Sequence, residues 1–272
     1  MRFQKLTLLG GVLVVVVVSG GCTHIIQSLK ARNQLNKGVL AFRNAQYQAA
    51  IEDFKQAVSL DPKLLNARLY LATAYSQEYI PGADTPDNDK MGEQAVQAFK
   101  GVLQMDPQNP TALASIAQLY YNMKDFERAK KYQRERLTVQ PNDPQPYYWI
   151  GVIDWLQCNV TDMKLRKSLK LNVPTPNGNF PPLPPRARLQ LGDKNGKLID
   201  EGLQALNKSL ELKPNDFDTM AYLNLMYRQK ADIETDNAER LADLKTADNW
   251  QQKAIDVRKE AAEHPATTSS AQ

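Results

Sequence analysis

The sequence predicts an all-α protein made of about five stacked helix pairs, and three observations support this fold class. Four segments of equal length align with one another without gaps: residues 49–62, 94–107, 128–141 and 201–214. Each has a small residue followed three or four positions later by a large one, a spacing that places both on one helix face. Each also ends in a proline, which cannot continue a helix and therefore marks its end.

A second kind of helix is predicted before each of these segments and once more after the last. In this helix a small residue precedes an aromatic residue, as at Gly38 and Phe42 or at Gly151 and Trp155. The small residue allows a neighbouring helix to approach closely, and the ring fills the space beside it. The two kinds of helix alternate, so each pair is expected to stack on the next.

This alternation resembles the tetratricopeptide repeat (TPR), and the resemblance extends over about residues 31–258. It implies antiparallel helix pairs stacked into a right-handed superhelical solenoid. The predicted repeats are residues 31–64, 65–109, 110–143, 144–216 and 217–263. A disordered polar tail is expected after them, at residues 264–272.

The chain departs from the repeat pattern in its second, fourth and fifth repeats. Insertions are predicted at about residues 78–90 and 157–197. Asn224 stands where the first helix of a repeat usually has Gly or Ala, and the second helix of the last repeat is expected at 246–263, without a closing proline. A polar, irregular last repeat is expected of the unit that caps a solenoid.

The N-terminus carries a short basic stretch and then an apolar run, residues 6–18. This run is too short to span a bilayer core and has the length of a secretory signal segment. The small residues before Cys22 resemble the lipobox of bacterial lipoproteins, although Ser19 stands where that family usually has Leu. The resemblance implies a signal peptide at 1–21, acylation of Cys22 and a lipidated linker at 22–30. An ordinary cleaved signal and a retained anchor remain as alternatives.

The lipoprotein resemblance also implies a location. Thr23 follows the cysteine where an Asp would favour retention in the inner membrane, so the outer membrane, facing the periplasm, is expected. Several acyl chains on one cysteine would hold the protein durably. Without residues 1–21 the formal charge is +2, which does not indicate a nucleic-acid partner.

The sequence gives no indication of catalysis. His24 lies beside the predicted anchor and His264 lies in the tail, so neither suits a rigid triad or zinc site. No phosphate-binding glycine motif is present, and the acidic loop around Asp84 lacks the spacing of a calcium loop. No enzyme activity, cofactor or metal is therefore predicted. Cys158 is expected to be a small buried hydrophobic residue, with an intermolecular disulfide as the alternative.

The TPR resemblance implies a concave binding face formed by the first helix of each repeat. In the fifth repeat the inner positions are Asp218, Ala221, Leu225, Arg228 and Gln229. The residues selected for partner binding along the whole face are Phe42, Arg43, Gln118, Tyr121, Asn122, Tyr148, Trp155 and Arg228. Large aromatic residues are frequent binding anchors. The alternative is that Tyr148 and Trp155 pack against the predicted insertion.

The insertion at 157–197 combines basic and apolar residues with a proline-rich stretch. Its predicted contact residues are Lys164, Arg166, Lys167, Lys170, Arg186 and Arg188. Three interpretations are open: a soluble loop lying over the repeats, a segment that contacts a partner, and an amphipathic helix at an anionic membrane.

These observations predict a lipid-anchored TPR scaffold of the bacterial cell envelope. Its expected partner is an envelope protein or peptide bound in the concave groove, for assembly of an envelope complex. The alternative is a structural spacer, or a factor associated with peptidoglycan or the membrane, that acts through the basic insertion. Fold alone does not assign function, so both hypotheses need the structure.

Overall fold

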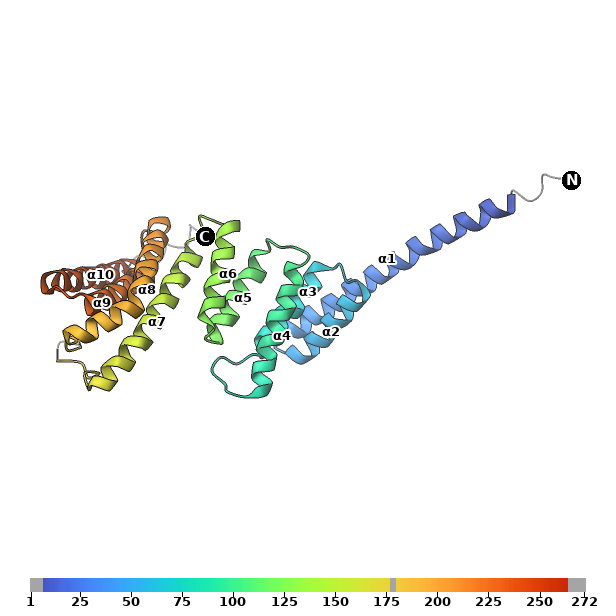
Figure 1. Ribbon diagram of the computed structural model, residues 1–272. Helices are drawn as coiled ribbons and strands as arrows, with labels where there is room; N and C mark the ends of the chain where they lie inside the picture. Colours follow the sequence, from blue (N-terminus) through green and yellow to red (C-terminus); the bar gives the residue numbers. More distant parts are fainter. Residues whose placement is uncertain (1–6, 177–179, 264–272) are drawn as a thin grey trace. The chain divides into compact units, whose positions relative to one another are not determined.

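The computed structural model describes residues 7–176 and 180–263, with side chains described from His24 onward. Within these residues the chain forms ten α-helices and no strands (Figure 1). The helices are α1 (Thr7–Arg43), α2 (Tyr47–Leu60), α3 (Leu65–Glu78), α4 (Pro86–Leu103), α5 (Pro110–Asn122), α6 (Phe126–Val139), α7 (Pro144–Leu169), α8 (Pro185–Leu212), α9 (Phe217–Ile233) and α10 (Asn237–Glu263). The all-α prediction is confirmed.

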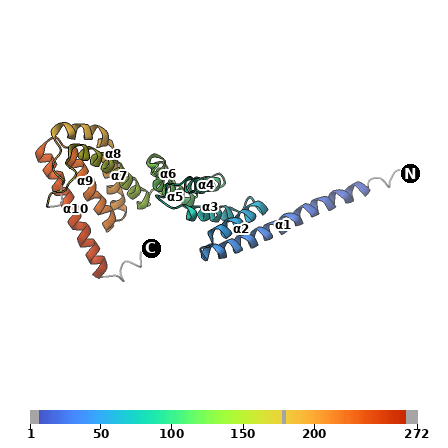
Figure 2. The ribbon, with the colours of Figure 1, turned by 90° about the horizontal axis from the view of Figure 1, so that it is seen from below.

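The chain divides into two compact units, Met1–Ala129 and Lys130–Gln272, with α6 crossing the boundary. In unit 1, α1 packs on α2, α2 on α3, α3 on α4 and α4 on α5. In unit 2, α7 packs on α8, α8 on α9 and α9 on α10, and both views show α9 and α10 side by side (Figures 1 and 2). Contacts between successive helices are what stacked repeats require.

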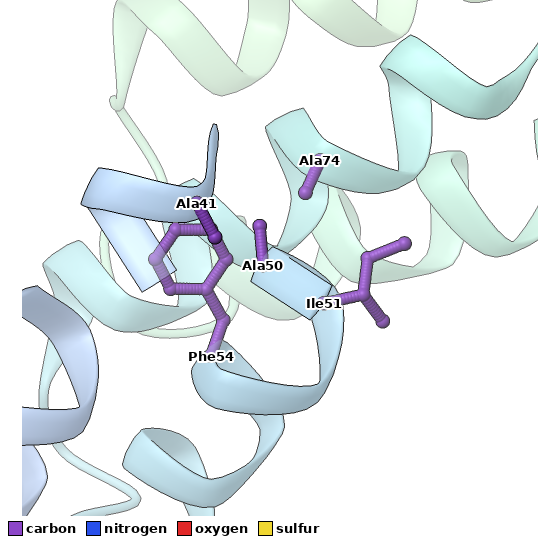
Figure 3. Packing of buried hydrophobic residues seen from close by; sticks show 5 residues of the cluster. All are labelled: Ala41, Ala50, Ile51, Phe54 and Ala74. Carbon is purple, nitrogen blue, oxygen red and sulfur yellow. The ribbon is translucent and has the colours of Figure 1, made fainter. Parts of the chain in front are cut away.

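The core of unit 1 shows why the repeat needs its small residues. Phe54 of α2 is fully buried beside Ala50 and Ala41 (Figure 3). Gly38 of α1 faces this ring so closely that a Cβ atom there would lie 2.5 Å from Phe54. The predicted close approach of a neighbouring helix at the small residue is therefore confirmed.

Unit 2 repeats this packing between α7 and α8. A Cβ atom on Gly151 would lie 2.4 Å from Leu206, which is fully buried together with Leu223 and Met226. The closing prolines also lie where the repeat pattern places them, two to four residues beyond the ends of α2, α4, α6 and α8.

The predicted insertion at 157–197 is largely helical, which contradicts the first of the three interpretations, a soluble loop lying over the repeats. Helix α7 continues to Leu169, and α8 already begins at Pro185. Leu183 and Leu191 are buried and pack against Leu165 and Leu171, so the extended parts of the two helices have an apolar core of their own. The sequence deviates from the repeat here because both helices of the pair are lengthened.

The shorter predicted insertion, at 78–90, is a loop only in its first part, because α4 begins at Pro86. The buried side chain of Asn88 organises this loop from within the helix. Its amide accepts a hydrogen bond from the Ile80 amide at 2.7 Å and donates to the carbonyls of Ile80 and Ala83.

The last helix pair differs from its predicted form at one boundary. Helix α10 begins at Asn237 rather than at residue 246, because the Asp236 carboxylate accepts hydrogen bonds from the amides of Ala238 and Glu239 and caps its first turn. Asn224, the exception to the small-residue rule, is buried and donates to the Ala247 carbonyl at 2.7 Å. Its amide therefore joins α9 to α10.

Candidate functional groove

Unit 2 contains a hollow of about 660 Å³ between α9 and α10. Phe180, from the segment that connects α7 and α8, closes one part of it. The other lining residues are Phe217, Asp218, Ala221, Asn224, Leu225, Arg228, Asp232, Arg240, Leu244, Gln251, Ala254, Ile255 and Arg258. The size and the mixture of apolar and charged groups are those of a binding groove.

The inner positions predicted for the fifth repeat form one wall of this groove. Asp218, Ala221, Leu225 and Arg228 all line it, whereas Gln229 is buried instead. The opposite wall, from α10, was not predicted. Five of the lining residues of α10 are three, four or seven positions apart, which places them on one face of the helix. They are Arg240, Leu244, Gln251, Ala254 and Arg258. This spacing could have indicated the wall from the sequence.

Three arginines give the groove a basic side. Arg228 Nη2 donates to the Asp248 carboxylate at 2.7 Å and to Gln251 at 3.3 Å. Arg240 has a buried Nε with no hydrogen-bond partner among the described residues, and Arg258 is exposed near the Phe217 ring. A carboxylate on a bound segment would give such groups charge-assisted hydrogen bonds.

One carboxylate in the groove is already engaged. Asp232 Oδ2 lies 2.7 Å from Arg166 Nη2, which is itself fully buried. Burial raises the pKa of Asp232, and Arg166 limits that rise. The groove thus keeps Asp218 as its exposed acidic group, while Arg240 and Arg258 form no ion pair among the described residues.

Two of the predicted aromatic residues meet in unit 2. The rings of Tyr148 and Trp155 contact Tyr222 of α9 edge to face, with centroids 5.6 and 5.5 Å apart. All three rings are partly buried against the core of the unit. Tyr222, which lies outside the predicted insertion, was not expected as their partner, and this packing gives the rings a structural role.

The remaining predicted groove residues lie in unit 1. Gln118 donates to Asn122 at 3.0 Å on α5, and the Tyr121 ring lies 6.2 Å from Phe126. Phe42 packs against Tyr47 at a centroid distance of 5.4 Å, and Arg43 is exposed at the end of α1. The predicted groove residues are therefore divided between the two units.

Two predicted contact residues of the basic insertion are corrected by the structure. Arg166 is buried and paired with Asp162 and Asp232, and Arg188 is buried and donates to the carbonyls of Leu183 and Glu234. A buried guanidinium needs such partners, so neither arginine is available at the surface. The other four predicted residues, Lys164, Lys167, Lys170 and Arg186, are exposed.

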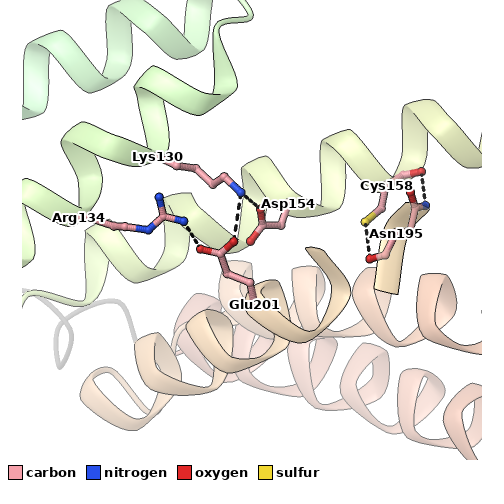
Figure 4. Close-up of polar contacts among 6 residues, drawn as sticks. All are labelled: Lys130, Arg134, Asp154, Cys158, Asn195 and Glu201. Atoms are coloured by element: carbon pink, nitrogen blue, oxygen red, sulfur yellow. Dashed lines mark hydrogen bonds and ion pairs between the residues drawn. The ribbon is translucent and has the colours of Figure 1, made fainter. Parts of the chain in front are cut away.

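An ion network that extends from a buried pair to the surface joins α6, α7 and α8 within unit 2 (Figure 4). Lys130 Nζ lies 2.6 Å from Asp154 and 3.2 Å from Glu201, and Glu201 also binds Arg134. Burial raises the pKa of the Asp154 carboxyl to about 7, although Lys130 opposes the rise. Asp154 is enclosed by packed helices, so its shifted pKa reflects burial in the structure rather than a catalytic role.

Cys158 is fully buried, as predicted. Burial raises the pKa of its thiol to about 12, which keeps it in the unreactive thiol form at neutral pH. Asn195 donates to the Cys158 carbonyl at 3.0 Å beside it (Figure 4). In the part of the chain that the structure describes, no group of three or more His, Cys, Asp or Glu residues is arranged to hold a metal ion.

The predicted acylation site at Cys22 and the predicted tail at 264–272 lie outside the residues whose side chains the structure describes. Residues 24–30, which belong to the predicted linker at 22–30, continue helix α1. A search of the described residues found no helix both long enough and apolar enough to cross a membrane.

Comparison with known proteins identifies the repeats. Family models for the tetratricopeptide repeat match residues 31–64 and 89–149. No curated protein matches the chain. Among solved structures, MamA matches with 13% identity and a TM-score of 0.57, covering 86% of this chain and 95% of MamA. MamA from Desulfovibrio magneticus RS-1 matches with 16% identity and a TM-score of 0.56, covering 85% and 96%.

A third similar structure is YrrB, described as a TPR protein with an unusual peptide-binding site. It shares 14% identity, covers 83% of this chain and 90% of its own, and has a TM-score of 0.50. Likenesses at this level of identity establish the fold. Together with the repeat matches and the paired helices, they show that this chain contains tetratricopeptide repeats and has the fold of TPR solenoid proteins.

Proposed function

We propose that this protein is a lipid-anchored TPR scaffold of the bacterial cell envelope that binds a segment of a partner protein in the groove between α9 and α10. The observation that carries the proposal is the groove itself. It lies at the inner positions of the fifth repeat and combines an apolar floor with three arginines. The description of YrrB as peptide-binding agrees with this use of the fold. The proposed role is non-catalytic assembly of an envelope complex.

The groove is best tested at exposed residues, because the aromatic residues of unit 2 also stabilise the fold. Ile255 and Arg258 are exposed on α10 and line the groove. The variant Ile255→Glu/Arg258→Glu should reduce capture of the partner at least tenfold in a photo-crosslinking experiment with the crosslinker placed at Leu225. It places acidic side chains on the apolar and basic wall.

A matched control lies on the same helix. Gln252 and Lys259 are exposed on α10 and do not line the groove, so Gln252→Glu/Lys259→Glu makes the same change in charge elsewhere. This control should retain the partner. Equal capture by the groove variant and wild type, with both folded, would refute the groove as the binding site.

The anchor is tested independently of the groove. Intact mass and membrane fractionation should show an acyl-modified, membrane-bound wild type and an unmodified, soluble Cys22→Ala protein. Several acyl chains on one residue bind membranes durably, so the difference should be nearly complete. An unmodified wild-type protein would contradict the lipoprotein hypothesis while leaving the groove hypothesis intact.

A further inference from the structure

The lengthened α7–α8 pair presents a basic surface that the repeat fold does not require. Among the described residues of 157–197, six basic side chains are exposed and the exposed acidic residue is Asp193. The exposed basic residues are Lys164, Lys167, Lys170, Arg186, Lys194 and Lys197. Because Arg166 and Arg188 are buried in ion pairs or hydrogen bonds, the exposed basic residues carry the surface charge.

The same surface exposes aliphatic side chains. Val160 is 58% exposed and Leu189 is 59% exposed, one on each of the two helices. Leu169 and Val173, at the end of α7 and in the segment after it, are 40% and 70% exposed. Exposed aliphatic side chains and exposed lysines therefore occur together on the lengthened pair, a composition typical of amphipathic rather than fully solvated segments.

A hollow of about 480 Å³ lies between α7 and α8 within this surface. Its lining contains Lys164 from α7 and Lys194 from α8, together with Val160, Leu165 and Leu191. Thr161, Ser168 and Gln190 complete the lining, and none of the described residues that line it is acidic. The hollow therefore places two ammonium groups beside aliphatic side chains, which complements a molecule with a phosphate group next to a hydrocarbon portion.

We propose that this surface, formed by the exposed residues of 157–197 and named the hairpin surface, binds anionic phospholipid at the membrane face. The combination of lysines with exposed aliphatic residues favours a lipid surface over an acidic peptide, which would satisfy the charges alone. This phospholipid-binding proposal rests in part on the acyl anchor proposed above. A chain tethered to the membrane has a high effective concentration there, so a weak second contact is sufficient.

The test measures flotation of the purified full chain carrying Cys22→Ala, so that the result does not depend on acylation. Vesicles of phosphatidylglycerol and phosphatidylethanolamine are compared with vesicles of phosphatidylcholine. The variant Lys164→Gln/Lys167→Gln/Lys194→Gln should lose the preference for anionic vesicles by roughly fivefold per lysine, about 100-fold in total. High salt should remove the same preference, because the interaction is screened.

Control variants keep the outcome specific to this surface. Lys245→Gln/Lys253→Gln/Lys259→Gln changes the net charge equally at exposed positions of α10 and should leave the preference unchanged. An environment-sensitive dye on Leu189→Cys should shift to shorter wavelength with anionic vesicles only, since Cys158 is buried and stays unlabelled. Equal loss by both triple variants would overturn the proposal. The proposal would also be overturned if the folded protein showed no preference for anionic vesicles but bound polyglutamate through the same lysines.

Discussion

Arg166 is the largest fully buried side chain of the described structure and holds two carboxylates in place. Its guanidinium lies 2.8 Å from Asp162 and 2.7 Å from Asp232, and it donates to the Pro181 carbonyl at 2.7 Å. It therefore joins α7 to α9 and to the segment that enters the groove. A sequence argument treats it as one more basic residue of a charged stretch.

We predict that Arg166→Leu lowers the free energy of unfolding by about 3–5 kcal/mol, because it removes the ion-pair partner of the buried Asp162 and of the partly buried Asp232. Urea denaturation measures the change. Arg186→Leu removes an exposed arginine from the neighbouring helix and should change the stability by no more than about 0.5 kcal/mol. Similar stabilities for the two variants would show that the buried pairs contribute nothing net.

Asp154 gives the protein a pH dependence with a definite sign. Its pKa is about 7 in the folded protein and near 3.8 in the unfolded chain, so between these values the folded state binds the extra proton. The contribution of Asp154 to the free energy of unfolding is therefore complete below about pH 4 and decreases as the pH rises towards 7.

The variant Asp154→Asn removes this titration. The free energy of unfolding of wild type, relative to that of the variant, should fall by a few kcal/mol between pH 4 and 7. This size follows because each unit of pKa shift corresponds to about 1.4 kcal/mol. Urea denaturation at a series of pH values measures this difference. A constant difference across that range would mean that Lys130 keeps Asp154 ionised throughout.

At the scale of the helix, close approach is set by residues without a side chain. Gly151 of α7 has Leu206 at 2.4 Å from the position of a Cβ atom, whereas Gly196 of α8 has no atom within 4 Å of that position. Alanine is the better helix former at both positions by about 1 kcal/mol. Comparing substitutions of the two glycines therefore separates the effect of helix propensity on stability from the effect of packing.

We predict that Gly151→Ala destabilises the protein by about 1–3 kcal/mol, because Leu206 or the backbone must move. Gly196→Ala should stabilise it by about 0.5–1 kcal/mol, since its added methyl group meets no neighbour. Thermal and urea denaturation of both variants provide the comparison. Stabilisation by both substitutions would contradict the close approach of α7 and α8.

The sequence predicted the elements that follow the repeat pattern and missed those that depend on distant contacts. The close helix approach at Gly38 and Gly151 follows from the spacing of the repeat, although their partners Phe54 and Leu206 were not predicted. The lengthening of α7 and α8 depends on Leu183 and Leu191 meeting Leu165 and Leu171 across the hairpin. A proline-rich, basic sequence does not reveal that contact, so a loop, a partner-binding segment and an amphipathic helix all remained open for this segment.

Of the two walls of the candidate groove, the wall from α9 was predicted from the sequence and the wall from α10 was not. The inner positions of α9 follow from the repeat register, and four of the five line the hollow. The wall from α10 depends on where that helix starts, which the Asp236 cap determines. In the same way, Arg166 and Arg188 were expected at the surface, because one partner of each, Asp232 for Arg166 and the Glu234 carbonyl for Arg188, is far away in sequence.

For the whole molecule, contacts between successive helices imply that stability is local. Each unit has its own core, around Phe54 in unit 1 and around Leu206 in unit 2. In such a chain a core substitution is expected to loosen its own repeat and its neighbours. Large-to-small substitutions of these side chains cost about 2–5 kcal/mol.

We predict that Phe54→Ala increases amide hydrogen exchange in α1, α2 and α3 but leaves α8, α9 and α10 at the wild-type rate. Leu206→Ala should produce the converse pattern. Hydrogen exchange followed by mass spectrometry resolves both sets of helices in one experiment. If either substitution accelerates exchange throughout the chain, the two units unfold as one cooperative body.

The lengthened α7–α8 pair also restricts how related chains can vary. These helices have 26 and 28 residues, about twice the 13 and 14 residues of α5 and α6. An insertion or deletion of one or two residues in one helix would rotate its buried face towards water. Length differences among relatives should therefore come in steps of about seven residues, two full turns, in both helices at once. Each step would move the tip by about 10 Å, so the reach of the hairpin surface and the position of Phe180 in the groove would change together.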